Sequence, residues 1–171
     1  MSVFGSLIDQ TEVISILKDA VEASRMVDNK TQSMTNTWLF TGPPGSGRSN
    51  AAIAFAAALV CKDGGCSKCN DCMSTIIGTH ADVELIKTAG LSIKIDEVRE
   101  LISRASWAPS VANYRVVVME DADRLTESAA NALLKVIEEP GLRTVWLLCA
   151  PTFTDVLPTI RSRCRHLSLR T

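Results

Sequence analysis

A glycine-rich loop between an apolar run and a small-residue helix restricts the fold of this chain more than any other feature. The run Trp38 to Phe40 precedes a Gly-x4-Gly-Arg-Ser segment, and a helix-like stretch from Asn50 to Val60 follows it. Glycines let backbone N–H groups turn toward one point, and the positive end of a helix adds to their attraction for an anion. The pattern predicts a phosphate-binding loop rather than an ordinary glycine turn. Its residues are Gly42, Pro43, Pro44, Gly45, Ser46, Gly47, Arg48 and Ser49.

One position of the loop departs from the usual pattern. A loop of this spacing normally carries lysine before its final serine or threonine, and this chain has Arg48 there. Lysine is a compact charge, whereas arginine is longer and planar, so the two are not interchangeable. Ser49 is still expected to ligate Mg²⁺ if ATP or ADP binds. The loop is therefore interpreted as a nucleotide-binding scaffold with an altered central cation.

Apolar patterning along the chain predicts strands that alternate with helices. Strand patterns occupy 38–40, 82–86, 114–119, 144–149 and 165–169; the run 82–86 alternates, whereas 114–119 and 144–149 are typical of buried strands. Helical patterns occupy 9–25, 50–60, 96–105, 126–137 and 155–160, with Met26 to Asn36 as a loop. The predicted N-caps are Asp9, Asp96 and either Thr126 or Asp123, and the predicted helix stop is Pro140-Gly141. Such alternation indicates an α/β fold with a central parallel five-stranded sheet covered on both faces.

Composition narrows the function classes. The chain has 171 residues, 46% of them apolar, which is typical of one packed domain. Its formal net charge of −1 provides no overall field for nucleic acid or membrane. The longest apolar run, 51–60, is too short to span a bilayer, and no secretory signal is visible. We expect a cytoplasmic protein, whose six cysteines need a reason other than disulfides.

Four of these cysteines form a compact cluster, with the spacing C-x4-C-x2-C-x2-C at Cys61, Cys66, Cys69 and Cys72. Thiolates at this density can close a tetrahedral Zn²⁺ site with bonds of roughly 2.3 Å. Because all four ligand positions are filled, the predicted metal is structural rather than catalytic. Iron–sulfur ligation and metal-free thiols are the alternatives. Cys149 and Cys164 lie far along the chain and are expected to pack as small apolar groups.

A carboxylate pair, Glu120-Asp121, follows the strand run 114–119. An ATPase with a loop of this type usually ends such a strand in Asp-Glu, where the aspartate helps to hold Mg²⁺ and the glutamate polarises the attacking water. The exchange shifts each carboxylate by one methylene, and positioning matters strongly in phosphoryl transfer. Together with Arg48, the exchange predicts weak or no ATP hydrolysis. Capping or surface carboxylates are the simpler interpretation of this pair.

The order of these motifs resembles bacterial clamp-loader subunits of DNA polymerase III, in the AAA+ superfamily. The resemblance rests on the loop, the cysteine insert, the carboxylate pair, the run Asn131 to Pro140 and Ser162-Arg163-Cys164, and it covers essentially the whole chain. It implies a P-loop AAA+ three-layer fold for 1–171, with a zinc module inserted at 61–72. Two members of that family carry such an insert, the gamma/tau motor subunit and the delta-prime subunit. This chain looks like delta-prime, because motor subunits keep the lysine and the Asp-Glu pair.

The resemblance also implies a role for Arg163 and a set of partners. In the family, the arginine of Ser-Arg-Cys reaches into the ATP site of a neighbouring subunit as an arginine finger. The implied partners are the motor and delta subunits, the sliding clamp and, through the assembly, primer–template DNA, with no membrane. Arg161, Arg163 and Arg165 alternate, and their simpler interpretation is a solvated basic edge. His80 and His166 match no motif and are expected to be structural.

Two other functions were weighed. A gamma/tau-like motor ATPase with an atypical site is the first alternative. A zinc-bearing nucleic-acid module is the second, and the near-neutral charge and scarce aromatic residues speak against it. Family members continue into lid and collar domains, so we expect these 171 residues to be the N-terminal module of a longer protein.

Overall fold

The computed structural model describes residues 2–25, 35–88, 90–139 and 143–171. Its centre is a sheet of five strands in the order β2-β3-β4-β1-β5, and every pairing is parallel. This confirms the predicted parallel five-stranded sheet. The strands are β1 (Thr37–Thr41), β2 (Val83–Ile86), β3 (Arg115–Met119), β4 (Thr144–Ala150) and β5 (Arg165–Ser168).

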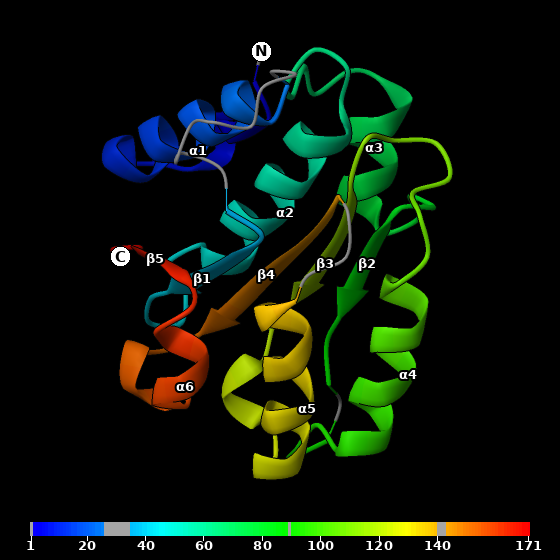
Figure 1. Ribbon diagram of the computed structural model, residues 1–171. Coiled ribbons are helices and arrows are strands. Elements are labelled where there is room, and N and C mark those ends of the chain that lie inside the picture. Colours follow the sequence, from blue (N-terminus) through cyan, green and yellow to red (C-terminus); the bar gives the residue numbers. More distant parts are fainter. Residues whose placement is uncertain (1, 26–34, 89, 140–142) are drawn as a thin grey trace.

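Helices cover both faces of the sheet, which makes three layers (Figure 1). One core packs α1 and α2 against alternate strand residues such as Trp38 and Val118, and the other packs α4 and α5 against Leu39 and Val117. Because β1, β3 and β4 are buried along their whole length, they read as continuous apolar runs, whereas the edge strands β2 and β5 are only partly buried. The helices are α1 (Thr11–Ser24), α2 (Arg48–Val60), α3 (Asn70–Ile77), α4 (Ile95–Ala105), α5 (Glu127–Glu138) and α6 (Pro158–Arg161). Short 3₁₀ turns occupy Val3–Ser6, Ala122–Arg124 and Phe153–Asp155. None of the helices in the described residues is long and apolar enough to cross a membrane.

The first residues of the helices were predicted less accurately than the presence of the helices. Asp9 is not an N-cap, because α1 begins after Gln10 and Asp9 has a positive φ of 59°. Asp96 lies inside α4, whose N-cap is Lys94; the backbone N–H of Lys94 donates to Glu97 Oε2 at 2.7 Å. Thr126 is confirmed as the N-cap of α5, where its Oγ1 accepts from the backbone of the first turn.

Some predictions fall on residues outside the described part of the chain. The helix stop at Pro140-Gly141 lies there, as does most of the loop from Met26 to Asn36. Within the described part, α3 was not predicted at all. The predicted helix at 155–160 is shorter than expected, since only the four residues of α6 are α-helical.

Candidate functional site

The glycine loop joins β1 to α2 as predicted. Gly45 and Gly47 have φ values of 86° and 82°, in the left-handed region that glycine adopts freely. A Cβ atom on Gly42 would lie 2.3 Å from the hydroxyl of Ser46, so no other residue fits at Gly42 without a shift. Gly47 is the N-cap of α2, and the loop therefore leads directly into the positive end of a helix of 13 residues.

Arg48 turns back onto the loop that it follows. Its Nη1 donates to the carbonyl oxygen of Gly42, at the beginning of the same loop. Within the described residues, Arg48 Nε and the hydroxyl of Ser46 are buried without a hydrogen-bond partner. Buried polar atoms without partners are costly and rare, and at such a loop they suit a polar ligand. Ser49 is half-buried in the first turn of α2.

The carboxylate pair lies at the carboxyl end of β3, separated from the glycine loop by β4. Glu120 Oε2 lies 4.0 Å from Lys87 Nζ, and Asp121 Oδ2 accepts from the backbone N–H of Thr88 at 3.2 Å. Asp121 is thus already engaged in holding the segment that follows β2. Both carboxylates are half-buried.

Cys149 lies close enough to both the glycine loop and the carboxylate pair for their charges to affect the pKa of its thiol. Burial raises the pKa of Cys149 to about 12; the charges of Glu120 and Asp121 also raise it, and the charge of Arg48 lowers it. The fold therefore brings Arg48, Glu120 and Asp121 to the same end of the sheet around β4. Cys149 itself is fully buried in the core, as an apolar packing residue should be.

Arg163 follows α6, on a different element from the loop. Its Nη2 lies 2.7 Å from Glu138 Oε1, and its Nη1 donates to the carbonyl oxygen of Thr159 at 2.8 Å. Arg161 stacks on the ring of Phe153 instead, with 4.8 Å between its guanidinium carbon and the ring centroid.

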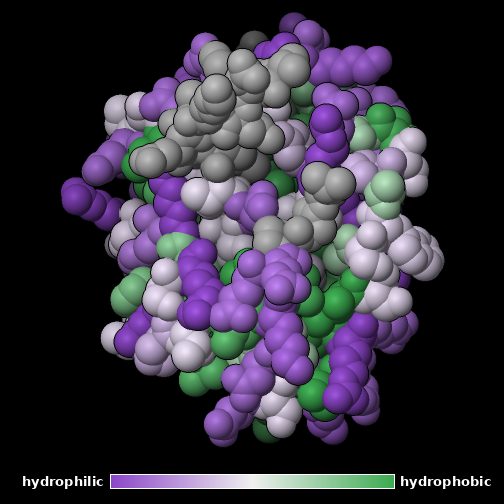
Figure 2. All heavy atoms as spheres, viewed as in Figure 1, coloured by the Kyte–Doolittle hydropathy of each residue, from purple (hydrophilic) through white to green (hydrophobic). Residues whose placement is uncertain are grey.

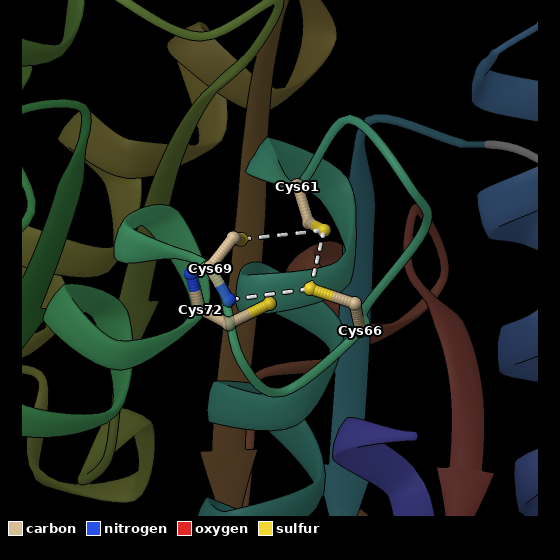
Figure 3. A group of neighbouring side chains, drawn as sticks. All are labelled: Cys61, Cys66, Cys69 and Cys72. Carbon is tan, nitrogen blue, oxygen red and sulfur yellow. Dashed lines mark hydrogen bonds between the residues drawn. The ribbon is translucent and has the colours of Figure 1, made fainter. Parts of the chain in front are cut away.

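The four clustered cysteines come together at the end of α2 and the start of α3 (Figure 3). All four Sγ atoms lie within 4.8 Å of one another. Cys61 Sγ is 3.8 Å from Cys66 Sγ and 3.6 Å from Cys69 Sγ. Sulfurs placed roughly 2.3 Å from a tetrahedral ion lie roughly 3.8 Å apart, so the cluster fits a metal ion of that kind.

Backbone N–H groups point at the sulfurs of the cluster. Cys69 N–H donates to Cys66 Sγ at 3.3 Å, and Asp63 N–H donates to Cys61 Sγ at 3.3 Å. The backbone N–H groups of Lys68 and Cys69 lower the pKa of Cys66 to about 7. Burial raises the pKa of Cys72, which lies deepest. A bound cation would stabilise the thiolate form at all four positions.

His80 fastens α3 to the sheet, in agreement with its predicted structural role. The backbone N–H of Asp82 donates to His80 Nδ1 at 3.0 Å, which leaves Nε2 to donate to Asp71 Oδ1 at 2.9 Å. His166 joins β5 to β1 through a 2.5 Å hydrogen bond between its Nε2 and Thr41 Oγ1. Burial lowers the pKa of His166.

Sequence analysis did not anticipate a cavity of about 430 Å³ between the start of α1 and β5. Gln10, Thr11, His166 and Arg170 are among its lining residues. It neighbours the glycine loop, because His166 is bonded to Thr41 at the end of β1. The residues that line this cavity lie far apart in the sequence, so no local motif predicts it. Only the pairing of β5 with β1 indicates that these residues come together.

A protein-family model described as "DNA polymerase III, delta subunit" matches residues 12–171. The delta-prime subunit of Bacillus subtilis is 32% identical over 92% of this chain and 46% of its own length. The delta-prime subunit of Pseudomonas aeruginosa is 36% identical over 75% of this chain and 41% of its length. The gamma/tau subunit of Mycobacterium tuberculosis H37Rv is 31% identical over 98% of this chain and 28% of its length. The chain thus spans less than half the length of these relatives.

Two solved structures from Thermotoga maritima share the fold. A gamma subunit-related protein has a TM-score of 0.66 and 23% identity, and the match covers 95% of this chain and 46% of that one. A RuvB variant has a TM-score of 0.64 and 17% identity, with 96% and 45% covered. With the parallel sheet and its glycine loop, these likenesses identify a P-loop AAA+ fold.

Proposed function

The chain belongs to the DNA polymerase III delta subunit family, and on that premise we propose that it is the N-terminal module of a delta-prime-like clamp-loader subunit. Lid and collar domains follow residue 171 in this proposal. The subunit works in the cytoplasm with motor and delta subunits to load the sliding clamp on primer–template DNA. The observation that carries the proposal is Arg163, whose side chain is 40% exposed just after the end of α6.

The phosphate loop supports delta-prime over a motor subunit. Arg48 is bonded to the Gly42 carbonyl within its own loop, so its guanidinium is not free to meet a nucleotide as a lysine would. Asp121 is engaged by the backbone of Thr88, and Glu120 has exchanged places with it. Each change weakens the alignment that phosphoryl transfer needs, so this subunit alone hydrolyses ATP weakly or not at all.

A gamma/tau-like motor is the second candidate, and one observation favours it. The gamma/tau relative from M. tuberculosis matches nearly the whole chain at an identity similar to that of the delta-prime relatives. Gly45 and Gly47 of the loop have the positive φ values that glycine adopts freely, and in this alternative Ser49, in the first turn of α2, ligates Mg²⁺ beside a bound ATP or ADP. Hydrolysis by the purified protein that falls when Glu120 and Asp121 are neutralised would favour the motor.

The cysteine cluster holds Zn²⁺ in this proposal. Cys61, Cys66, Cys69 and Cys72 supply four sulfurs within 4.8 Å of one another, and four protein ligands leave no position for water on a tetrahedral ion. The metal therefore ties the end of α2 to the start of α3 and takes no part in catalysis. Iron–sulfur ligation is less suited, because the closest sulfur pairs already fit a single ion.

Arg163 acts in trans, as an arginine finger for the neighbouring motor subunit. Its guanidinium cannot lose a proton and presents donors in a planar fork that matches phosphate oxygens. Such a cation stabilises the charge that develops on a transferred phosphate. Arg161 is less suited to this role because it is stacked on Phe153 and bonded to the Phe153 carbonyl.

The test is ATP hydrolysis by the complete subunit, reconstituted with motor subunits, clamp and primed DNA. Arg163→Ala should lower hydrolysis at the site that it completes by about tenfold or more. Arg99→Ala, which removes the same charge from an exposed position on α4, is the control and should leave the rate unchanged. An unchanged rate with Arg163→Ala would remove the finger from the proposal.

A further inference from the structure

Three arginines alternate around α6 and β5, but their surroundings differ. Arg161 lies over the Phe153 ring and also donates to backbone carbonyls. Arg165 lies over the ring of Trp38, 4.9 Å from the centroid, on the buried first strand. Both side chains are therefore anchored by the body of the domain. Arg163 is held at the surface by a carbonyl oxygen, a hydroxyl group and the carboxylate of Glu138.

The side chain of Arg163 is folded back rather than extended. Its Nη1 donates at 2.8 Å to the carbonyl oxygen of Thr159, which lies four residues earlier, and at 3.3 Å to the hydroxyl of Ser162. Its Nη2 meets Glu138 Oε1 at 2.7 Å. Glu138 is the last residue of α5, which packs beside α6 (Figure 1), so the negative end of α5 adds to the attraction for the guanidinium.

We propose that Glu138 holds the side chain of Arg163 in an inactive position before the subunit assembles. The carboxylate of Glu138 accepts from the guanidinium donors that a phosphate group of the neighbour's nucleotide takes over in the assembly. This inference rests on the proposed role of Arg163 and adds a residue that controls it. Carboxylate and phosphate oxygens accept from a guanidinium in the same way, so one can exchange for the other. A finger that reaches another subunit must leave the carbonyl of Thr159, which the folded-back side chain now contacts.

Exposure makes the exchange feasible. The side chains of Arg163 and Glu138 are 40% and 44% exposed, so water competes for both and the ion pair is weak. A weak internal partner reduces the fraction of subunits whose finger is available, and it reduces apparent affinity for the nucleotide by that fraction. It also keeps the guanidinium from pairing with other anions before assembly. Glu138 is therefore a residue that acts through Arg163.

The chain provides a matched control in Glu139. Glu138 and Glu139 are neighbouring exposed carboxylates at the same end of α5, but the ion pair with Arg163 belongs to Glu138. Glu138→Gln and Glu139→Gln remove the same charge from the same helix end. Any general effect of charge on α5 is therefore common to both variants.

The experiment measures kcat and KM for ATP in the reconstituted assembly, with Arg163 intact and with Arg163→Ala. Glu138→Gln should raise kcat/KM about threefold, which is the range for an exposed ion pair, and Glu139→Gln should leave it unchanged. In the Arg163→Ala background, Glu138→Gln should have no effect, because its target is gone. Thermal unfolding of each variant should stay close to the parent protein, since both side chains are half-exposed.

Three results would overturn the inference, and they are distinguishable. A lower rate with Glu138→Gln would mean that the carboxylate supports the finger rather than competing with it. An unchanged rate with Glu138→Gln, beside a large loss with Arg163→Ala, would exclude the proposed role of Glu138 and leave that of Arg163 as an arginine finger. No loss of rate with Arg163→Ala would exclude the proposed roles of both Arg163 and Glu138.

Discussion

Arg48 alters the phosphate loop through one contact. A guanidinium is long enough to return to the carbonyl oxygen of Gly42, and it does so while its Nε stays buried without a partner among the described residues. A lysine has no planar fork and places a compact charge instead. We therefore expect the geometry of this one side chain to limit the access of a phosphate to an otherwise intact loop.

We expect Arg48→Lys to raise the affinity of the purified protein for MgATP by on the order of tenfold. Titration with a fluorescent ATP analogue measures this directly. Arg48→Ala is the companion variant: it removes the internal contact without adding a cation, so its gain should be smaller. Equal, weak binding by all three proteins would show that Arg48 does not limit access to the loop.

Asp82 is a fully buried carboxylate whose oxygens are all satisfied. It accepts from the backbone N–H groups of Ser110 at 2.6 Å, Val111 at 2.8 Å and Ala112 at 2.7 Å. Burial opposes the charge, but these donors outweigh it, and with Arg115 they lower the pKa of Asp82. One side chain thus fixes the loop between α4 and β3.

We expect Asp82→Asn to lower the free energy of unfolding by about 3 kcal/mol at pH 7, because an amide group cannot accept from all three donors. The folded-state pKa lies below the unfolded value of about 3.9, so this stabilisation is present above that pH and fades as pH falls through the folded pKa. Urea titrations at pH 7 and pH 3.5 measure both effects. A difference between the two proteins that is the same at both pH values would contradict the prediction.

At the scale of elements, α3 depends on its surroundings. It has eight residues, which is too short for a stable isolated helix, and its N-cap Cys69 belongs to the cysteine cluster. His80 holds its first turn through Asp71. The first turn of α3 is therefore held both by the cysteine cluster and, through His80, by the segment that leads into β2.

We expect Cys66→Ser to lower bound zinc from one ion per chain toward none and to speed amide exchange across 61–77 by about tenfold or more. Metal analysis and hydrogen–deuterium exchange give the two measurements. Exchange in β1, β3 and β4 should change less, because these strands are also held by their pairing in the central sheet. Cys164→Ser, outside the cluster, is the control. A stable, metal-free parent protein would contradict the proposed zinc site.

Elements differed in how far their sequence predicted them. The central strands were predictable because burial on both faces leaves continuous apolar runs such as Val116 to Met119. Helix starts were not, because a cap depends on local hydrogen bonds: Lys94 is an N-cap whose backbone is satisfied by Glu97. The short helix α3 has too few apolar positions to show a period.

The parts of the candidate site also differ in how well the sequence predicts them. The glycine loop and the cysteine cluster are local in sequence, so spacing alone predicted both groups. The Arg163–Glu138 pair depends on the packing of α6 against α5, and no pattern within either segment indicates it. Sequence reasoning identified the arginine through a resemblance, and the structure supplied the carboxylate.

For the whole molecule, the near-neutral net charge favours a subunit of an assembly over an independent nucleic-acid binder. The formal net charge is −1, with 18 basic and 19 acidic residues. Figure 2 shows one face that is largely hydrophilic, with hydrophobic atoms gathered where α4 and α5 lie. Contact with DNA is therefore expected through the assembly rather than through this domain.

We expect the isolated domain to bind primed DNA weakly and with little dependence on salt. A protein that neutralises several phosphates loses about 10³- to 10⁵-fold in affinity between 50 and 200 mM salt, and a near-neutral chain lacks the charges for this. Fluorescence anisotropy with labelled DNA at both salt concentrations measures the difference, which should stay below about tenfold. The zinc-treated and chelator-treated proteins should behave alike, because in our proposal the zinc ion holds a helix and not DNA. Tight binding that is lost with salt or with the metal would instead favour a zinc-bearing nucleic-acid module.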